Sequence, residues 1–360
     1  MRILVVTDAW YPQVNGVVRT LTTLKAELEI AGHDVIYITP DQFRTITCPT
    51  YPEIRLAVFP GKQMAQLIES YRPCAIHIAT EGTLGLSARH YCVKRGVPFT
   101  TAFHTRFPEY LQARFLIPKQ WTYKAMHWFH SQASNVMVAT QSIENELTAH
   151  GFKNIQRWSR GVDTELFKPR SKDFLDLPRP IMLYVGRVAI EKNIVAFLKV
   201  RTAGTKVIIG DGPQLDALKR KHPDAAFLGA KQGEELAQYF AAADVFVFPS
   251  LTDTFGLVLL EALASGIPVA AYPVPGPLDV IGQEPVGCLH HSLDAAIEIA
   301  LKADPAMCRA HAMTFSWAAS TAQFLANISV FDVATLEANR SSQSKPQSKP
   351  QPRLQPSALN

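Results

Sequence analysis

The sequence contains little cysteine and no long apolar run. Only five of its 360 residues are cysteines, and none forms a Cys-x-x-Cys pair, which fits reduced thiols and argues against a disulfide framework or a zinc site. No stretch approaches the ~18 consecutive apolar residues of a membrane span. The first apolar run stops at Thr7-Asp8 without a small-residue cleavage site, so it does not look like a secretory signal. We therefore expect a cytoplasmic protein.

Two ligand-binding motifs are also missing. No Asp-x-Asp occurs anywhere in the chain, and such a pair would be expected if a metal held a diphosphate. Nor does Gly-x-Gly-x-x-Gly follow a strand: the first strand runs into Asp8-Ala-Trp-Tyr-Pro, and Gly210-x-Gly212 is followed by Pro213. A nicotinamide-dependent oxidoreductase is therefore a weak alternative. We expect no metal and no cofactor.

Charge is distributed unevenly along the chain. Residues 1–168 hold 18 Lys and Arg against 13 Asp and Glu (+5), residues 169–339 hold 14 against 18 (−4), and residues 340–360 hold 4 against none (+4). A basic half suits phosphates, nucleic acid or an anionic membrane. An ordinary solvated surface explains this modest excess equally well.

Strand-like and helix-like patterns alternate along most of the chain, which is typical of an α/β fold. Apolar runs predict a first series of strands at residues 3–7, 35–39, 75–79, 99–103 and 136–139. A second series is predicted at residues 181–185, 206–209, 226–228, 245–248 and 268–271. The series restart after the Pro- and charge-rich stretch 168–180. We therefore expect two doubly wound, Rossmann-like domains facing each other across a cleft, with ligand loops at the carboxyl ends of their strands.

The strongest signal is the segment Phe248-Pro-Ser-Leu-Thr-Asp-Thr-Phe-Gly-Leu-Val-Leu-Leu-Glu-Ala-Leu-Ala-Ser-Gly-Ile-Pro-Val-Ala. A buried strand ends, a polar loop contains Asp253, and Gly256 opens a helix that carries Glu261. Free amides at a helix start favour an anion such as a diphosphate, or sugar hydroxyls. Read singly, Asp253 is more simply a helix N-cap and Glu261 a solvated helix residue.

This segment closely resembles the donor-binding signature of family 4 retaining glycosyltransferases, in which seven residues separate two acids and a small-Gly-x-Pro-Val turn follows. Most members have Glu where this chain has Asp253. The resemblance implies that Asp253 and the amides of Phe255, Gly256 and Leu257 hold the donor sugar. It also implies that Glu261 binds the ribose of the donor nucleotide.

A second element matches the same family. Tyr184-Val-Gly-Arg-Val-Ala-Ile-Glu-Lys-Asn contains the family's Gly-Arg-x-x-x-x-Lys pattern, which implies that Arg187 and Lys192 hold the donor diphosphate. Two fixed cations can neutralise the charge that develops on a nucleoside diphosphate leaving group. Taken alone, these residues are more often surface charges. Their position after a buried strand and Gly186 favours the site.

The first half carries further matches. Pro12-Gln-Val-Asn-Gly-Val-Val resembles the family's loop after the first strand, which implies that the Gly16 amide approaches the donor phosphate. Ala102-Phe-His-Thr-Arg-Phe-Pro-Glu-Tyr resembles the His-Thr segment of members that glycosylate lipids, which implies that His104 contacts the donor sugar. Without that match, a structural hydrogen-bonding role for His104 has even odds. Arg160-Gly-Val-Asp-Thr-Glu-Leu-Phe matches an interdomain segment in which members usually have Asn in place of Arg160.

The resemblance covers residues 1–330 and implies the two-domain architecture called GT-B. We divide the chain into an acceptor-side domain (1–168), a nucleotide-sugar-binding domain (169–314), a helix that crosses back to the first domain (315–338) and a polar, Pro-rich tail expected to be disordered (339–360). We expect a retaining, metal-independent α-glycosyltransferase that uses GDP-mannose or a UDP-hexose, with His104, Arg187, Lys192 and Asp253 at the reacting centre. A non-catalytic nucleotide-sugar-binding protein is the other alternative.

One stretch bears on the acceptor. Cations and aromatic residues alternate between Arg106 and His130, with only Glu109 opposing them: Arg114, Lys119, Lys124, His127 and His130 lie among Phe107, Tyr110, Phe115, Trp121, Tyr123, Trp128 and Phe129. Such mixtures suit a membrane interface. We expect a lipid acceptor, peripheral binding to the inner face of the membrane and no nucleic-acid partner. An ordinary pair of helices whose aromatic side chains pack inward explains this stretch equally well.

Overall fold

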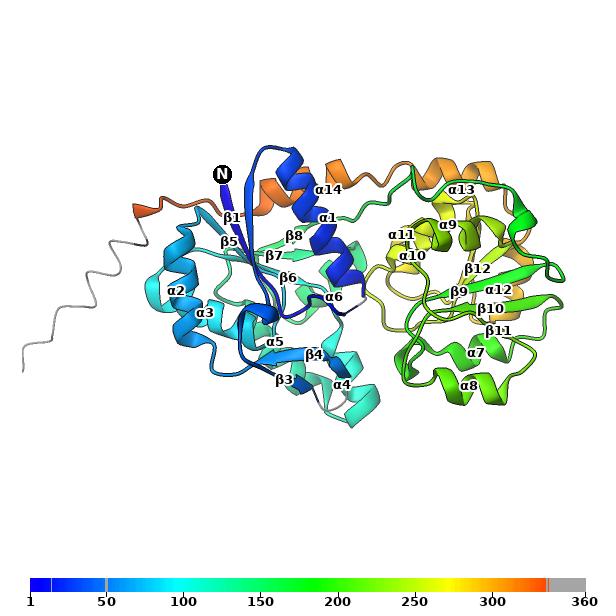
Figure 1. The fold of residues 1–360 in the computed structure, drawn as a ribbon, viewed down its shortest axis with the longest axis horizontal. Helices are drawn as coiled ribbons and strands as arrows, with labels where there is room; N and C mark the ends of the chain where they lie inside the picture. The colour runs from blue at the N-terminus through cyan, green and yellow to red at the C-terminus, as the bar shows by residue number, and fades with distance from the viewer. Residues whose placement is uncertain (14, 49–50, 335, 337–360) are drawn as a thin grey trace, which may run out of the picture.

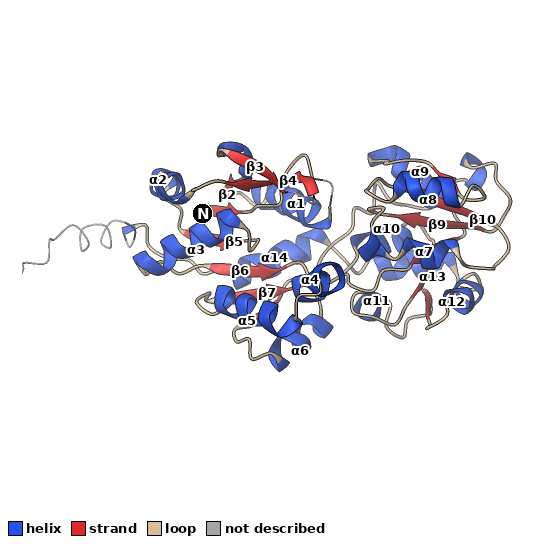
Figure 2. Ribbon diagram, turned by 90° about the horizontal axis from the view of Figure 1, so that it is seen from below, coloured by secondary structure: helices blue, strands red, loops and turns tan. Residues whose placement is uncertain are grey.

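The computed structural model describes residues 1–13, 15–48, 51–334 and 336 of the chain. They form two six-stranded parallel sheets, one in each half of the molecule, and a short antiparallel hairpin (Figure 1). Helices cover both faces of each sheet, so that the strands lie between two helical layers (Figure 2). The predicted fold class, two Rossmann-like α/β domains, is confirmed.

The first sheet has the order β2-β1-β5-β6-β7-β8. Its strands are β1 (Arg2–Val6), β2 (Asp34–Ile38), β5 (Ala75–Ile78), β6 (Thr100–Phe103), β7 (Asn135–Val138) and β8 (Ile155–Arg157). Residue Ile3 of β1 pairs with Val35 on one side and Ala75 on the other. Because side chains alternate across a strand, Ile3 and Val5 enter one core and Leu4 and Val6 enter another.

The second sheet has the order β11-β10-β9-β12-β13-β14. Its strands are β9 (Ile181–Val185), β10 (Thr205–Ile209), β11 (Ala226–Phe227), β12 (Val245–Phe248), β13 (Val269–Ala271) and β14 (Gly287–Leu289). Strand β9 lies between β10 and β12, and all the pairings are parallel. The loops that follow β9, β10 and β12 therefore emerge side by side at one edge.

Helices fill the connections between strands. Those of the first half are α1 (Gly16–Ile30), α2 (Gly61–Tyr71), α3 (Thr83–Arg95), α4 (Phe107–Phe115), α5 (Lys119–His130) and α6 (Gln141–Ala149). Those of the second half are α7 (Ile194–Leu198), α8 (Leu215–Lys221), α9 (Gly233–Ala242), α10 (Leu257–Ala264), α11 (Pro277–Val280), α12 (Leu293–Ala300) and α13 (Pro305–Ala312). The last helix, α14 (Trp317–Asn327), returns to the first half.

Helix α14 packs into the first domain. Its Phe324 is fully buried among β1 and α1 residues, and Ser159 and Asn135 of the first half hydrogen-bond to the side chain of Gln323 and the carbonyl of Asn327. Val330 then forms a bridge with Ala75 of β5. The last helix is thus a physical tie between the two halves.

The ten predicted strands are confirmed. The hairpin of β3 (Thr45–Cys48) and β4 (Tyr51–Ala57) and the short strands β8 and β14 were not predicted, because they are short or lack an apolar run. The helix predicted from the spacing of Val17, Leu21, Leu24 and Leu28 is α1, and Gly32 follows it with φ +82°. The predicted disordered tail lies outside the described residues.

Candidate active site

Three loops of the second sheet meet at the carboxyl edge of its central strands. The amide of Val188, after β9, donates to the Asp211 carbonyl after β10 at 2.8 Å. The side chain of Asn193 donates to the carbonyl of Pro249, after β12, at 3.1 Å. Residues as many as 56 positions apart along the chain therefore form one continuous surface, as the parallel pairing of β9 with its two neighbours requires.

Glycine allows two close approaches at this edge. A Cβ atom on Gly210 would lie 1.8 Å from the Gly186 carbonyl oxygen, so the β9 and β10 loops can touch only with glycine there. Gly256 has φ +86° and stands at the N-cap of α10, with Phe248 and Leu259 close to where a Cβ would lie. Helix α10 thus begins directly over the end of β12.

Asp253 contacts Lys192 across the junction of two loops. The Lys192 ammonium lies 2.5 Å from Asp253 Oδ1, whereas Asp253 Oδ2 is buried and accepts no hydrogen bond from the described residues. No described side chain caps α10, whose N-cap is Gly256. The interpretation of Asp253 as a helix cap is therefore wrong.

Glu261 is buried inside α10 and paired with the other domain. Its side chain is 4% exposed, and Oε1 forms an ion pair with the Arg19 guanidinium of α1. The second oxygen, Oε2, is buried without a partner among the described residues. Burial raises the pKa of the Glu261 carboxyl, and Arg19 opposes that rise. The interpretation of Glu261 as a solvated helix residue is also wrong.

Arg187 pairs with a residue that sequence reasoning did not single out. Its guanidinium lies 2.5 Å from the carboxylate of Glu53, which belongs to β4 in the first half. Glu53 and Arg19 therefore reach the second domain from the first. Neither stands in a recognisable motif, and each contact depends on how the two halves face each other.

The starts of α1 and α10 also face each other. A Cβ on Gly16 would meet the Leu257 side chain at 3.8 Å, an ordinary contact, and Asn15 caps α1 through its side chain. Phe255 is buried in the core of the second domain and packs edge-on against Phe315. Its side chain is structural, so any contact of Phe255 with a ligand would use its backbone.

His104 completes this cluster from the first domain. Its carbonyl accepts a hydrogen bond from the Thr254 hydroxyl at 2.8 Å, which sets the β6 loop against the start of α10. Its Nδ1 faces the Arg160 guanidinium at 3.2 Å, and its Nε2 is buried without a partner among the described atoms. Burial and the Arg160 charge hold the pKa of His104 well below its usual value. The sequence-predicted site residues thus lie in one interdomain cluster.

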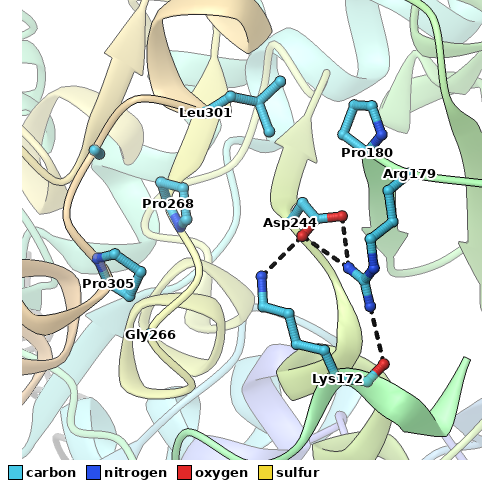
Figure 3. A pocket seen from close by; sticks show the side chains of 9 residues that line it. Lys172, Arg179, Pro180, Asp244, Gly266, Pro268, Leu301 and Pro305 are labelled. Carbon is cyan, nitrogen blue, oxygen red and sulfur yellow. Dashed lines mark hydrogen bonds and ion pairs between the residues drawn. The ribbon is translucent and has the colours of Figure 1, made fainter.

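A separate surface pocket lies at the opposite edge of the second sheet. Residues that precede its strands line it, and Figure 3 shows Asp244 held by Lys172 and Arg179. Asp244 also accepts a hydrogen bond from the Ile181 amide at 2.8 Å. Each charge there has a partner, so this cluster anchors the start of β9 and lies away from the interdomain site.

The described residues hold neither a metal-binding cluster nor a membrane-spanning helix. In this part of the chain, no three or more His, Cys, Asp or Glu side chains are arranged to hold a metal ion. None of the helices in this part of the chain has the length and apolar character needed to cross a membrane.

The two facing Rossmann-like domains form a fold of the GT-B type, and comparison with known proteins identifies the family. Residues 14–166 match the model of Glycosyltransferase Family 4, and residues 179–303 match that of Glycosyl transferases group 1. The chain is 30% identical over 331 residues to a GDP-mannose-dependent alpha-mannosyltransferase of Mycobacterium tuberculosis (82% of this chain, 87% of the relative). It therefore belongs to the family 4 glycosyltransferases and is a transferase enzyme.

One further relative and one solved structure are also similar to this chain. An alpha-monoglucosyldiacylglycerol synthase of Streptococcus pneumoniae is 30% identical over 352 residues (85% of this chain, 80% of the relative). Sucrose-phosphate synthase from Thermosynechococcus elongatus superposes with a TM-score of 0.68 at 20% identity (95% and 98% of the two chains), which supports the GT-B fold. Nothing in these similarities supports an oxidoreductase or a non-catalytic binding protein.

Proposed function

We propose that this enzyme transfers a hexose from a nucleotide-diphosphate sugar to a lipid acceptor, with retention of the anomeric configuration. The proposal that a nucleotide sugar binds here rests on three buried polar atoms that have no protein partner in the described structure: Asp253 Oδ2, Glu261 Oε2 and His104 Nε2. A buried polar atom without a partner costs about 1–3 kcal/mol. Three of them in one interdomain cluster suit a ligand with many hydroxyl groups.

Each polar group has a separate part in this proposal. Arg187 and Lys192 stabilise the charge that develops on the departing diphosphate, assisted by the amides of Gly16, Phe255, Gly256 and Leu257 at the two facing helix starts. Glu261 accepts from the ribose through Oε2, and Asp253 accepts from the sugar through Oδ2. His104 contacts the sugar at the reacting centre.

The ion pairs that Arg187 and Lys192 form in the structure do not prevent these two cations from binding a diphosphate. Arg187 and Lys192 are each partly exposed, with 29% and 25% of the side chain accessible. Exchanging a carboxylate for a diphosphate at such a pair costs little, because exposed ion pairs contribute about 0.2–1 kcal/mol. The diphosphate of the donor carries two negative charges, as many as Glu53 and Asp253 together, and the departing nucleoside diphosphate carries more, so the two cations are best matched as the leaving group develops its charge.

The donor and acceptor classes are inferred from the relatives. The mycobacterial relative is named for GDP-mannose and the streptococcal one for a glucosyldiacylglycerol product. We propose a hexose donor of this kind, GDP-mannose or a UDP-hexose, and a lipid that carries a free hydroxyl group.

Helix α5 supplies a surface suited to a lipid acceptor. Trp121 and Trp128 are 69% and 56% exposed, seven residues apart, with exposed Lys124 between them on the same helix. Tyr123 and Phe129 are buried and Phe107 of α4 packs against the core, so the inward-packing alternative holds for these three aromatic residues. Exposed tryptophans beside lysine are typical of a membrane interface, and we propose that α5 docks on anionic lipid.

A donor screen tests the enzyme's proposed reaction. We expect nucleotide release from one of several nucleotide sugars to rise when a diacylglycerol-type lipid is present. Lys192→Ala and Glu261→Ala should each reduce kcat/KM by about a hundredfold or more, as the loss of a group that stabilises the leaving charge or fixes the donor would. Lys199→Ala, which removes an exposed charge at the end of α7, should have no effect. Equal activity in all four proteins would refute the proposed site.

A further inference from the structure

Arg160 is buried in the first domain and fixed in place on several sides. The residue is 4% exposed and follows β8. Its Nη1 donates to the carbonyls of Trp158 at 2.5 Å and Ser159 at 3.0 Å, and its guanidinium lies 4.2 Å from the Trp158 ring centre. The remaining terminal nitrogen, Nη2, lies 3.2 Å from His104 Nδ1. The guanidinium therefore presents one N–H group to the histidine from a rigid support.

We infer that Arg160 is a positioning residue that fixes His104 as the uncharged tautomer with its proton on Nε2, so that His104 donates a hydrogen bond to the donor sugar and does not act as a general base. This inference rests on the proposed function, which puts the sugar beside His104. It adds the direction of the hydrogen bond and the residue that sets it.

The tautomer follows from hydrogen-bonding capacity. A guanidinium has N–H donors and no acceptor, so His104 Nδ1 must supply a lone pair to Arg160. A neutral imidazole carries one proton, which must then be on Nε2. That atom is buried and has no partner among the described residues, so it is left to donate to a ligand. A proton on Nδ1 would instead set two N–H donors against each other, and an imidazolium would also set two positive charges against each other.

The other groups around His104 do not favour an imidazolium. Burial lowers the pKa of Arg160 to about 9, so the guanidinium is still charged at neutral pH. His77 of β5 is uncharged there, because burial and the Arg160 charge lower its pKa to about 3. Thr254 faces the His104 carbonyl with an uncharged hydroxyl, and the adjacent Asp253 is ion-paired with Lys192.

Nuclear magnetic resonance of the intact protein tests the tautomer directly. Two-bond proton–nitrogen correlations separate a protonated ring nitrogen from an unprotonated one, and comparison with His104→Gln assigns the His104 signals. We expect the Nε2-protonated neutral form throughout about pH 5–8, the interval in which an ordinary histidine titrates. A proton on Nδ1, or an imidazolium in that interval, overturns the inference. Because this measurement needs no turnover, it can fail independently of the proposed function.

Kinetics test whether Arg160 acts through His104. Arg160→Met keeps an apolar side chain over Trp158, and we expect kcat to fall about tenfold, as the misdirection of one hydrogen bond would cause. We also expect a new acid limb in the pH profile, because burial and the Arg160 charge together lower the pKa of His104 and the substitution removes the second of these causes. That limb should be absent from the double variant Arg160→Met/His104→Gln. Arg89→Met removes another buried arginine, one that donates to the carbonyls of Trp128 and Phe129 in α5, and should keep the wild-type profile. Parallel profiles for Arg160→Met and wild type overturn the inference even if both proteins are folded.

Discussion

Arg19 and Glu261 form an ion pair that joins the two domains at the candidate active site. Arg19 lies one turn into α1 with 43% of its side chain exposed, whereas the Glu261 side chain on α10 is nearly buried. The pair occupies one oxygen of the carboxylate expected to bind the ribose and leaves the other without a partner among the described residues. The first domain is thereby in contact with a proposed donor-binding group of the second.

Arg19→Met should weaken binding of the nucleoside diphosphate and make it pH-dependent. Burial already raises the pKa of Glu261, and removing Arg19 removes the charge that opposes this rise. The carboxylate should then be protonated at a higher pH, so that donor affinity is lost as the pH falls. We expect an increase in Kd of about tenfold near neutrality, which corresponds to about 1.4 kcal/mol. Calorimetric titration with GDP and UDP measures this Kd across about pH 5–8, the range in which a raised carboxyl pKa is visible.

Arg19→Lys is the matched control for that change. Lysine keeps the positive charge near Glu261 and should retain most of the wild-type affinity and its pH dependence. An Arg19→Met protein with the wild-type Kd at every pH would show that the ion pair is only a surface contact.

Glu53→Gln should tighten binding of the nucleoside diphosphate. Glu53 competes with the diphosphate for Arg187, and both side chains of this pair are about one-third exposed. Since such pairs are worth about 0.2–1 kcal/mol, we expect Kd to fall by up to about fivefold. Glu29→Gln removes a similar charge from an exposed pair on α1 and should leave Kd unchanged. A higher Kd for Glu53→Gln would mean that Glu53 contributes to the donor site.

The sequence predicted the parts of the site that depend on local order. A buried strand followed by glycine and a cation, or by an acid and a helix start, has a recognisable pattern, and the parallel sheet brings such strand ends to one edge. Arg187, Lys192, Asp253 and Glu261 stand at such positions, and the resemblance to the glycosyltransferase family supplied the roles proposed for them. The residues of the first domain that contact this site were harder to predict, because their contacts depend on how the two halves of the molecule face each other.

Arg19, Glu53 and Arg160 contribute through contacts that no local pattern encodes. Arg19 resembles any exposed arginine on an amphipathic helix, and Glu53 lies in a hairpin that was not predicted. Arg160 was noted only as a departure from the family's usual Asn. Its guanidinium meets His104 because β6 and β8 flank β7 in one sheet, a spatial relation that follows from sheet order and not from spacing along the chain.

Gly256→Ala should destabilise the start of α10 and weaken donor binding. The residue has φ +86°, and an added Cβ would lie 3.1–3.2 Å from Leu259 and Phe248. A left-handed conformation costs an alanine about 1–2 kcal/mol, and the crowding adds to that cost. Gly32→Ala has a similar φ, +82°, but meets nothing within 4 Å. We expect both variants to lower the melting temperature, Gly256→Ala by more, and only Gly256→Ala to raise the Kd for GDP or UDP. Equal effects on Kd would contradict a role for the α10 start in donor binding.

Combined replacement of Trp121, Lys119 and Lys124 by serine should release the enzyme from anionic vesicles. Trp121 is 69% exposed, and each lysine near an anionic membrane contributes about 1 kcal/mol to binding. Lys119 also pairs with Glu109, so part of its charge is already compensated. Flotation with vesicles that contain phosphatidylglycerol should show the loss, and raising the salt concentration should weaken binding of the wild type. Replacement of Lys219, Lys221 and Ile299, an exposed set in the second domain with the same charge, should leave flotation unchanged. If the first triple variant floats like the wild type, α5 is not the docking surface, and the exposed tryptophans need another explanation.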